Sequence, residues 1–294
     1  MRKGLIAVIL SLSLLSVGEL LVNPAESKVV TEKLSQEELK TQLIEAIENF
    51  NSKLVKELIL KGVDSNFFIK EGSYKGYTPL MLVIQLSDLE LVKLLISKGA
   101  NVNDKDDDNN QTPLMFACFN GNKEIVKLLI SKGANVNTKD KNNKTALMFA
   151  FETGNKEIID LFLSKEADIN INSKNLSNET LLLFACKGGN KEIVELLISK
   201  GADVNDKDNY NKSILMYACE KGNKEIVELL LSKGANINIV DTLGYTPLMY
   251  SCENGHKEIV ELLISKGADV NDKDNYNKTS LIYAIEKDNK EIAE

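Results

Sequence analysis

Four cysteines form the residue set in this chain with the clearest capacity for chemistry. Thiols can pair as disulfides or hold a zinc ion when the fold brings them together. Each stands six residues after a Thr or Ser that recurs along the chain, and the four are Cys118, Cys186, Cys219 and Cys252. If the recurring segments are stacked helices, neighbours lie about 8–10 Å apart, whereas a disulfide requires Cα atoms within about 7 Å. We therefore expect four buried, free thiols that act as small apolar residues.

His256 is the one histidine in the chain and the natural candidate for a general base near neutral pH. Its counterparts in the other recurring segments are Asn or Asp at an expected helix start, and no copy supplies a nucleophile beside this position. We therefore interpret His256 as a helix-capping residue at the surface.

Residues 104–109, with the sequence DKDDDN, begin like a calcium-binding loop. Such a loop needs Gly at its sixth position and a bidentate Glu at its twelfth. Asn109 and Met115 stand there instead, so an acidic, solvated loop is the favoured interpretation. The sequence also contains no phosphate-binding glycine loop and no Ser-His-Asp set. We predict that the chain is not an enzyme and has no catalytic residue, metal site or cofactor.

The charge balance limits the class of partner. The chain has 36 basic and 43 acidic residues, interleaved along its length, and a net charge of −7. Binding to nucleic acid depends on Lys and Arg side chains that neutralise phosphates, so we expect no nucleic-acid partner. We also expect no small-molecule substrate. An apolar content of 43% is enough for a folded core.

The start of the chain differs from the rest. Arg2 and Lys3 precede an uncharged apolar run over residues 5–17, and Glu19 follows. A charged start and a short apolar run are typical of a secretory signal peptide. We predict such a signal at residues 1–22, which makes the protein periplasmic or secreted.

The exact processing of this segment has open alternatives. Cleavage near residues 16–18 or at Ala25 fits a small-residue site. If the apolar run continues through residues 20–22, the segment is instead an uncleaved membrane anchor and the one contact with a membrane. In either case, we expect residues 23–40 to form a linker and the start of a capping helix, and residues 41–294 to form the main domain.

That domain is built from a unit that recurs every 33 to 35 residues. A Thr or Ser marks the copies, at Thr78, Thr112, Thr145, Thr180, Ser213, Thr246 and Thr279. Its hydroxyl can accept from a free N–H of the helix that it opens. Three copies place Pro directly after it, where a missing N–H costs nothing. Each unit therefore begins with a short inner helix.

An outer helix follows in each unit. Ten residues after the Thr, an Asn, an Asp or His256 precedes apolar residues that form one stripe at the helical period, as in residues 124–130. Most copies then have a Gly suited to the left-handed position after a helix, but Glu166 stands there in one unit and predicts a different helix end. A Gly or Asn two residues before each Thr favours a tight turn with positive φ.

These features resemble the ankyrin-repeat family. The shared motifs are a Thr-Pro-Leu opening and a Gly-Ala-Asp-Val-Asn stretch, at residues 78–80, 112–114, 246–248, 201–205 and 267–271. The resemblance implies an all-α solenoid of stacked helix-turn-helix units with short β-hairpin-like loops. The family usually has His after Thr-Pro-Leu, whereas this chain has Met or another apolar residue there. We therefore expect the polar network between repeats to be absent and apolar packing to replace it.

The end units should differ from the others, because each repeat is covered only by its neighbours. Ser35 and Glu38 fit a capping box that opens a first helix. At the other end the last unit is incomplete, so Leu281, Ile285 and Ile292 should lack full cover. We expect about eight units and a monomer.

A row of aromatic residues offers a binding surface. The residue four positions after each Thr points about 200° away from the packed Leu on a helical wheel, toward the face that lines the concave groove in ankyrin-like stacks. Aromatic anchors dominate interface energetics, so we predict that a protein partner binds there and at the loop tips. In the groove, the residues of this row are Phe116, Phe149, Phe184, Tyr217, Tyr250 and Tyr283, and Phe119, seven positions after its Thr, is their neighbour. At the tips they are Tyr210, Leu243 and Tyr276. The alternative for the groove row is packing against the loops of the next unit.

The predicted function is therefore that of a protein–protein interaction scaffold. One alternative is a structural spacer or surface module without a specific partner. Another is a secreted effector or inhibitor that acts by binding. Repeat stacks share a fold while binding unrelated targets, so the sequence does not name the partner.

The unit that begins at Thr145 carries a separate hypothesis. It has Phe162 in place of Leu, Glu166 in place of Gly, and a longer loop through residues 172–176. These departures predict a weak junction where the stack opens first.

Overall fold

The computed structural model describes residues 34–164 and 168–294. The predicted signal peptide or anchor and Glu166 lie outside these residues. Residues 36–294 form one compact unit, and the fold described is that of this unit. Among the described residues, no helix has the length and apolar character needed to span a membrane.

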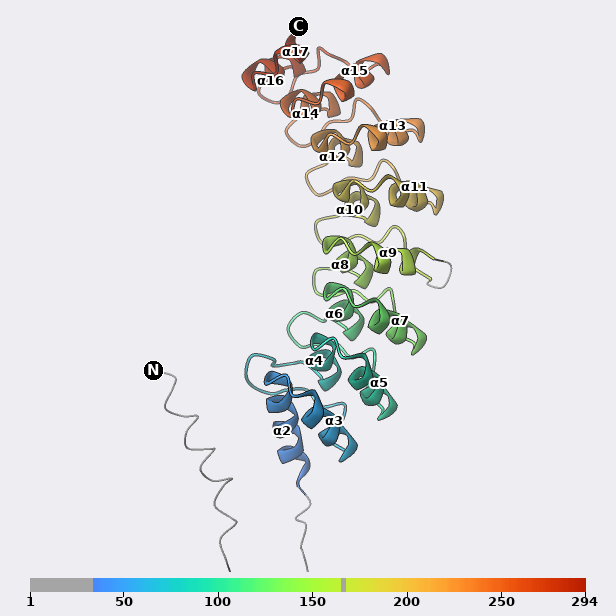
Figure 1. The fold of residues 1–294 in the computed structure, drawn as a ribbon. Coiled ribbons are helices and arrows are strands. Elements are labelled where there is room, and N and C mark those ends of the chain that lie inside the picture. Colours follow the sequence, from blue (N-terminus) through green and yellow to red (C-terminus); the bar gives the residue numbers. More distant parts are fainter. Residues whose placement is uncertain (1–33, 165–167) are drawn as a thin grey trace, which may run out of the picture. The chain divides into compact units, whose positions relative to one another are not determined.

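The described residues form sixteen helices and no sheet, arranged as eight inner–outer pairs (Figure 1). The inner helices are α2 (Gln36–Glu48), α4 (Pro79–Gln85), α6 (Pro113–Phe119), α8 (Ala146–Glu152), α10 (Leu181–Gly188), α12 (Ile214–Lys221), α14 (Pro247–Glu253) and α16 (Ser280–Glu286). The outer helices are α3 (Ser52–Leu60), α5 (Leu89–Ser97), α7 (Lys123–Ser131), α9 (Lys156–Leu163), α11 (Lys191–Ser199), α13 (Lys224–Ser232), α15 (Lys257–Ser265) and α17 (Lys290–Ala293). Successive inner helices pack on one another along the stack, so the predicted all-α solenoid is confirmed.

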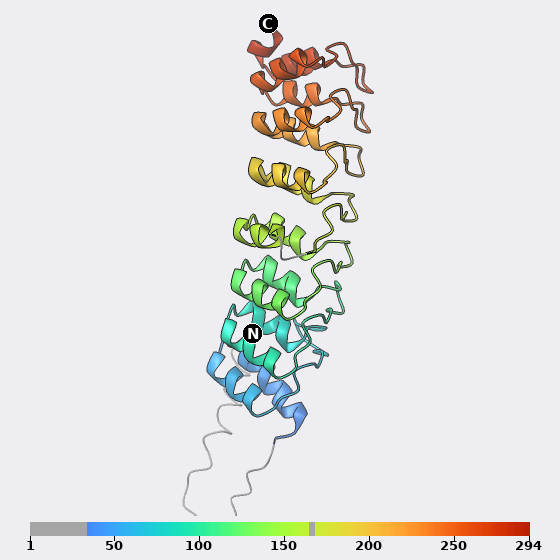
Figure 2. The ribbon, with the colours of Figure 1, turned by 90° about the vertical axis from the view of Figure 1, so that its right-hand side faces the viewer.

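Hairpin loops join the pairs and project from one side of the stack (Figure 2). The predicted tight turns are present, with φ of 59° at Asn143 and 57° at Asn211. At Gly76, where φ is 82°, a Cβ atom would lie only 2.8 Å from the Cβ of Asp107 in the next hairpin. Only glycine therefore fits this turn against its neighbour.

The recurring Thr and Ser cap most inner helices as predicted. In α6 the Oγ1 of Thr112 accepts from the N–H of Met115 at 3.4 Å, and the Sδ of Met115 accepts from the N–H of Thr112 at 3.4 Å. Methionine thus closes a capping box at the position where the family usually has His. Thr145 and Thr279 lack the side-chain bond.

The outer helices begin after the predicted cap residues, but the side chains of three of these residues make no cap hydrogen bond. Asp88 and Asn155 accept backbone N–H groups of α5 and α9. His256 stands at the predicted N-cap position of α15, but its side chain accepts no backbone N–H group of that helix, and the same holds for Asn223 and Asn289. The ring of His256 lies against Gly222, where the missing Cβ leaves room, and its Nε2 is 3.0 Å from the carbonyl oxygen of Glu220 in the preceding repeat.

At the position where the family usually has His, Met81, Met115 and Met249 are buried, as the expected apolar packing requires. A polar network made by other residues nevertheless links the repeats. The Nδ2 of Asn103 donates to the carbonyl oxygen of Gly133 at 3.0 Å, and the Oδ1 of Asn103 accepts from the N–H of Asn135 at 2.8 Å. Equivalent bridges run from Asn66, Asn137 and Asn205. An Asn side chain can donate and accept at once, so each of these residues satisfies backbone groups of the following repeat.

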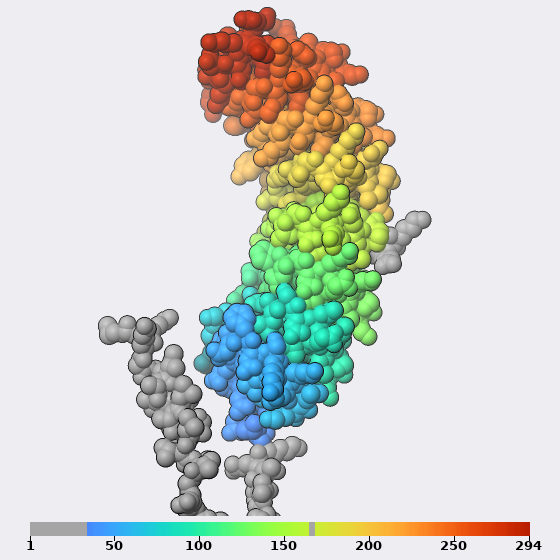
Figure 3. Space-filling view, viewed as in Figure 1, coloured from blue at the N-terminus to red at the C-terminus, as the bar shows by residue number. Residues whose placement is uncertain are grey.

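The core lies between successive pairs, and side chains fill the space between the ribbons (Figure 3). Ile125, Val126 and Leu129 of α7 are fully buried, as the helical stripe predicts. The four cysteines are buried and free, which confirms the prediction. Burial raises the pKa of Cys219 to about 12, so the thiol stays protonated. At the last repeat, Leu281 is exposed.

Helix α9 ends differently from the other outer helices, as Glu166 predicted. It stops at Leu163, and Ser164 is extended with ψ of 164°, whereas Lys132 at the end of α7 stays near the helical region. Phe162 is fully buried. Packing of α9 against α11 is weaker than between the other neighbouring outer helices in the described residues.

Candidate functional site

The ten predicted binding residues lie on two surfaces, the hairpin tips and the concave face formed by the inner helices. At the tips, Tyr210, Leu243 and Tyr276 are 71%, 47% and 67% exposed. On the inner helices, Phe119 is 60% exposed. The half-buried members are Phe116, Phe184, Tyr217 and Tyr250, and the buried members are Phe149 and Tyr283.

In the C-terminal half of the concave face, a buried carboxylate at the base of each hairpin holds a tyrosine. The hydroxyl of Tyr217 donates to Oδ2 of Asp208 at 2.7 Å. The Oδ1 of Asp208 accepts from the N–H groups of Tyr210 and Lys212 at 2.8 and 2.9 Å, so the same carboxylate also shapes the hairpin. Burial, together with Asp208, raises the pKa of Tyr217 and keeps its hydroxyl a donor. The same arrangement recurs as Tyr250 with Asp241 and Tyr283 with Asp274.

Lysine side chains lie over these rings. The Nζ of Lys212 is 4.5 Å from the ring centroid of Tyr217 and 4.1 Å from that of Tyr250, so it bridges two repeats. Glu220 pairs with it at 3.0 Å. The Nζ of Lys187 also lies 4.5 Å from the ring centroid of Tyr217. This half of the face is therefore an aromatic row whose hydroxyls and ring faces already have partners within the chain.

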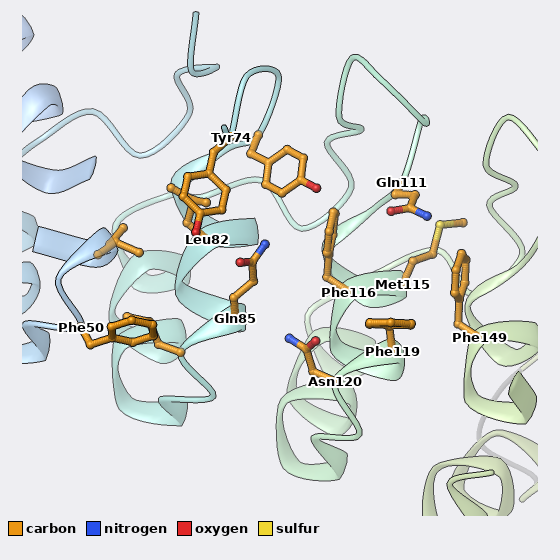
Figure 4. A pocket seen from close by; sticks show the side chains of 13 residues that line it. Phe50, Tyr74, Leu82, Gln85, Gln111, Met115, Phe116, Phe119, Asn120 and Phe149 are labelled. Atoms are coloured by element: carbon orange, nitrogen blue, oxygen red, sulfur yellow. The ribbon is translucent and has the colours of Figure 1, made fainter. Parts of the chain in front are cut away.

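The N-terminal half contains a pocket of about 610 Å³ instead. Figure 4 shows Phe116 and Phe119 reaching into it from α6, with Gln85 of α4 and Phe50 opposite. The ring of Tyr77 meets that of Phe116 edge-on, with centroids 5.1 Å apart. The lining carries no charged side chain.

Two positions in the repeat explain this difference. One directly precedes the Thr, and the other follows it by seven residues, one helical turn beyond the aromatic residue. In chain order the pairs are Tyr77 with Gln85, Gln111 with Phe119, Lys144 with Glu152, Glu179 with Lys187, Lys212 with Glu220, Tyr245 with Glu253 and Lys278 with Glu286. The first two pairs are uncharged, whereas the later Lys–Glu pairs form salt bridges over the rings.

Sequence reasoning did not identify the pocket. It named Phe116, Phe119 and Phe149, which all line the cavity, but not Tyr77 or Gln85. The readable signal was the change from uncharged to charged residues at these two equivalent positions. Comparing the copies position by position would have found it.

The hairpin tips are joined to one another through their backbones. The N–H of Thr242 donates to the carbonyl oxygen of Tyr210 at 2.9 Å, and the N–H of Asn275 donates to that of Leu243 at 3.0 Å. The N–H of Tyr276 is held in turn by Asp274 within its own hairpin, at 2.9 Å. Exposed apolar side chains thus stand on a rigid ladder.

The acidic loop at residues 104–109 remains a loop. Asp106 is buried, and its Oδ1 accepts from the N–H of Asn109 at 2.5 Å. The Nζ of Lys141 donates to the carbonyl oxygen of Asp107 at 2.9 Å. In the part of the chain that the structure describes, no three His, Cys, Asp or Glu side chains converge as metal ligands would.

Comparison with known protein families gives a match. A family model described as "Ankyrin repeats (3 copies)" matches residues 7–106, 102–175, 170–241 and 233–294. These four segments together cover almost the whole sequence. No curated protein matches the chain significantly.

Proposed function

The chain belongs to the ankyrin-repeat family, and from this premise we propose that it is a non-enzymatic scaffold that binds a partner protein through its hairpin tips and concave face. Ankyrin repeats are generally protein–protein interaction modules, and proteins built from them are typically binding scaffolds without catalysis. The observation that carries the proposal is the tip row, defined as Tyr210, Leu243 and Tyr276. Three large apolar side chains lie exposed in consecutive repeats.

The tip row suits binding for two physical reasons. Burial of apolar surface against a partner lowers the free energy of the complex. Tyrosine is also among the residues that most often anchor interfaces. The backbone hydrogen bonds from Thr242 to Tyr210 and from Asn275 to Leu243 hold the row before a partner arrives. Less conformational entropy is then lost on binding.

The concave face beside the tips extends this surface. Its aromatic row is flanked by Lys–Glu pairs such as Lys278 with Glu286, at 2.7 Å, which supply a polar rim. Phe119 is its most exposed aromatic member among the predicted residues. We assign the tips and the open parts of this face to one continuous binding surface.

Variants at the tips test the proposal. Replacing Tyr210 and Tyr276 by Ala should abolish saturable capture of the partner in pull-downs while urea unfolding stays unchanged, because both side chains are exposed. The control is Ile264→Ala, which removes a side chain that is 48% exposed on the opposite, outer-helix side. A structural spacer would capture no saturable partner at all. An inhibitor or effector would also change the partner's activity when bound.

We also propose that the protein acts outside the cytosol and as a monomer. The support for export is the charged start at Arg2 and Lys3, which is followed by the apolar run at residues 5–17. A charge placed in that run by Ile9→Asp should keep the protein inside the cell. Sequencing the N-terminus of the exported form would distinguish a cleaved signal from an anchor. Analytical ultracentrifugation would test the monomer.

A further inference from the structure

The uncharged pocket in the N-terminal half of the concave face is the feature that the tip surface does not explain. Figure 4 shows that its side chains come from successive inner helices and from the hairpin above them, with Phe50 on one side and Phe119 on the other. Phe50 is 79% exposed, yet both rings line the pocket. When an apolar group enters the cavity, it covers apolar rings that were exposed to water at the mouth, and this burial lowers the free energy.

We propose that this pocket receives an uncharged, bulky apolar side chain of an extended peptide segment in the partner protein. The inference rests on the scaffold function proposed above and names the chemistry that the partner must present. Its volume of about 610 Å³ lies within the range of about 300–1,000 Å³ found for ligand pockets.

The charge pattern selects against a charged occupant. No cation or carboxylate lines the pocket, so a charged side chain would lose its water without gaining a counter-ion. The equivalent places in later repeats hold pairs such as Lys212 with Glu220, at 3.0 Å. Because these later positions carry charged side chains, they can offer a counter-ion to a charged group of the partner and do not exclude it.

The polar side chains of the lining suit a peptide backbone. Gln85 and Gln111 form no side-chain hydrogen bond among the described residues, and the Nδ2 of Asn120 makes one long contact, 3.4 Å, to the carbonyl oxygen of Ile84. Amide groups can donate to and accept from the main chain of a bound peptide. Apolar rings with free amides beside them therefore match an apolar side chain together with its own peptide groups.

The test uses random peptides displayed on phage and selected on the full chain. Selected peptides should share a bulky uncharged residue, and changing that residue to Lys or Asp should weaken binding by about tenfold or more. The closing variant combines Gln111→Lys with Phe119→Glu, which copies the Lys–Glu pair of later repeats and so keeps a pattern that this fold already accommodates. The affinity of the selected peptides for this variant should also fall by about tenfold or more.

Two further variants keep the result interpretable. Phe119→Ser removes an exposed ring without adding a charge, so it should reduce peptide binding even if the closing variant fails to fold. Ile264→Ala, at an exposed position on the outer helix α15, is the control and should leave peptide affinity unchanged. If the tips fail to bind a partner while the pocket still selects apolar peptides, the tip surface is wrong and the pocket stands.

Three outcomes would overturn the proposal. The first is that no peptide is enriched, or that enriched peptides share a charged anchor. The second is that peptides bind the closing variant and Phe119→Ser as tightly as the wild type. The third is a concentration-dependent dimer that Phe119→Ser dissociates, since the occupant would then be a second copy of the chain.

Discussion

The hydroxyl of Tyr250 donates a 2.8 Å hydrogen bond to Oδ2 of Asp241, a buried carboxylate nine residues earlier in the chain. The other oxygen of Asp241 accepts from the N–H groups of Leu243 and Tyr245 in the hairpin. One carboxylate thus ties the inner helix α14 to the hairpin that carries the tip residue Leu243. The concave face and the tip row are mechanically linked in this repeat.

Removal of that hydroxyl should destabilise the repeat. Tyr250→Phe keeps the ring beneath Lys212 but leaves Oδ2 of Asp241 without its donor. Loss of a hydrogen bond to a buried charged group costs about 1–3 kcal/mol, and urea unfolding followed by circular dichroism would measure it. Tyr210→Phe is the matched control, because Tyr210 is exposed and should show no effect. Equal stability of both variants would contradict the prediction.

The opposite change should stabilise an earlier repeat. Phe149 stands nine residues after Asp140, just as Tyr250 follows Asp241, and the buried Oδ2 of Asp140 has no hydrogen-bond partner. Phe149→Tyr supplies the missing hydroxyl, so we expect a gain of about 1 kcal/mol in the free energy of unfolding. Phe119→Tyr is the control, since that ring is exposed. A loss of stability in Phe149→Tyr would show that the added oxygen does not reach the carboxylate.

Acid should weaken the repeat that begins at Thr180. Burial alone would raise the pKa of Glu179, but hydrogen bonds from Lys187 at 2.5 Å and Asn175 at 2.7 Å bring it below the ordinary value. A lowered folded-state pKa gives stability that is present above the unfolded value of about 4.3 and is lost as pH falls through the folded value.

Glu179→Gln should therefore be less stable than the wild type at pH 7, and the difference should shrink as pH falls below about 4. Urea midpoints recorded across that range measure the effect. Glu195→Gln, at an exposed position on α11, is the control and should show no such convergence. A difference that stays constant with pH would refute the role of the Glu179 carboxylate.

The junction at α9 should open before the rest of the stack. Its early end at Leu163 and its weak packing against α11 predict faster amide exchange over residues 156–164 than over the matching residues of α7. Hydrogen–deuterium exchange read by mass spectrometry would show this. Glu166→Gly, which restores the residue that other repeats have, should slow exchange there. Uniform protection across the outer helices would exclude a weak junction.

Local features were predictable because their causes lie within a few residues. Thr112 caps its helix through Met115, three positions away, and Asn143 enables a turn by its own backbone preference. The burial of the four cysteines was predictable because all four occupy the same position in their repeats. The side-chain contact of His256 was not predictable, because its partner, the carbonyl of Glu220, belongs to the preceding repeat.

The sequence by itself determined the repeat period, the helix pairs, their caps and the burial of the small apolar positions, since each depends on chemistry inside one unit. Only the tertiary structure decided which concave positions are covered and which are open. Residues about one repeat length apart come together through stacking, and the approach of Lys212 to the ring of Tyr250 in the next repeat depends on how the two repeats pack. The pocket at Phe119 is open because the charged pair that covers later repeats is missing there.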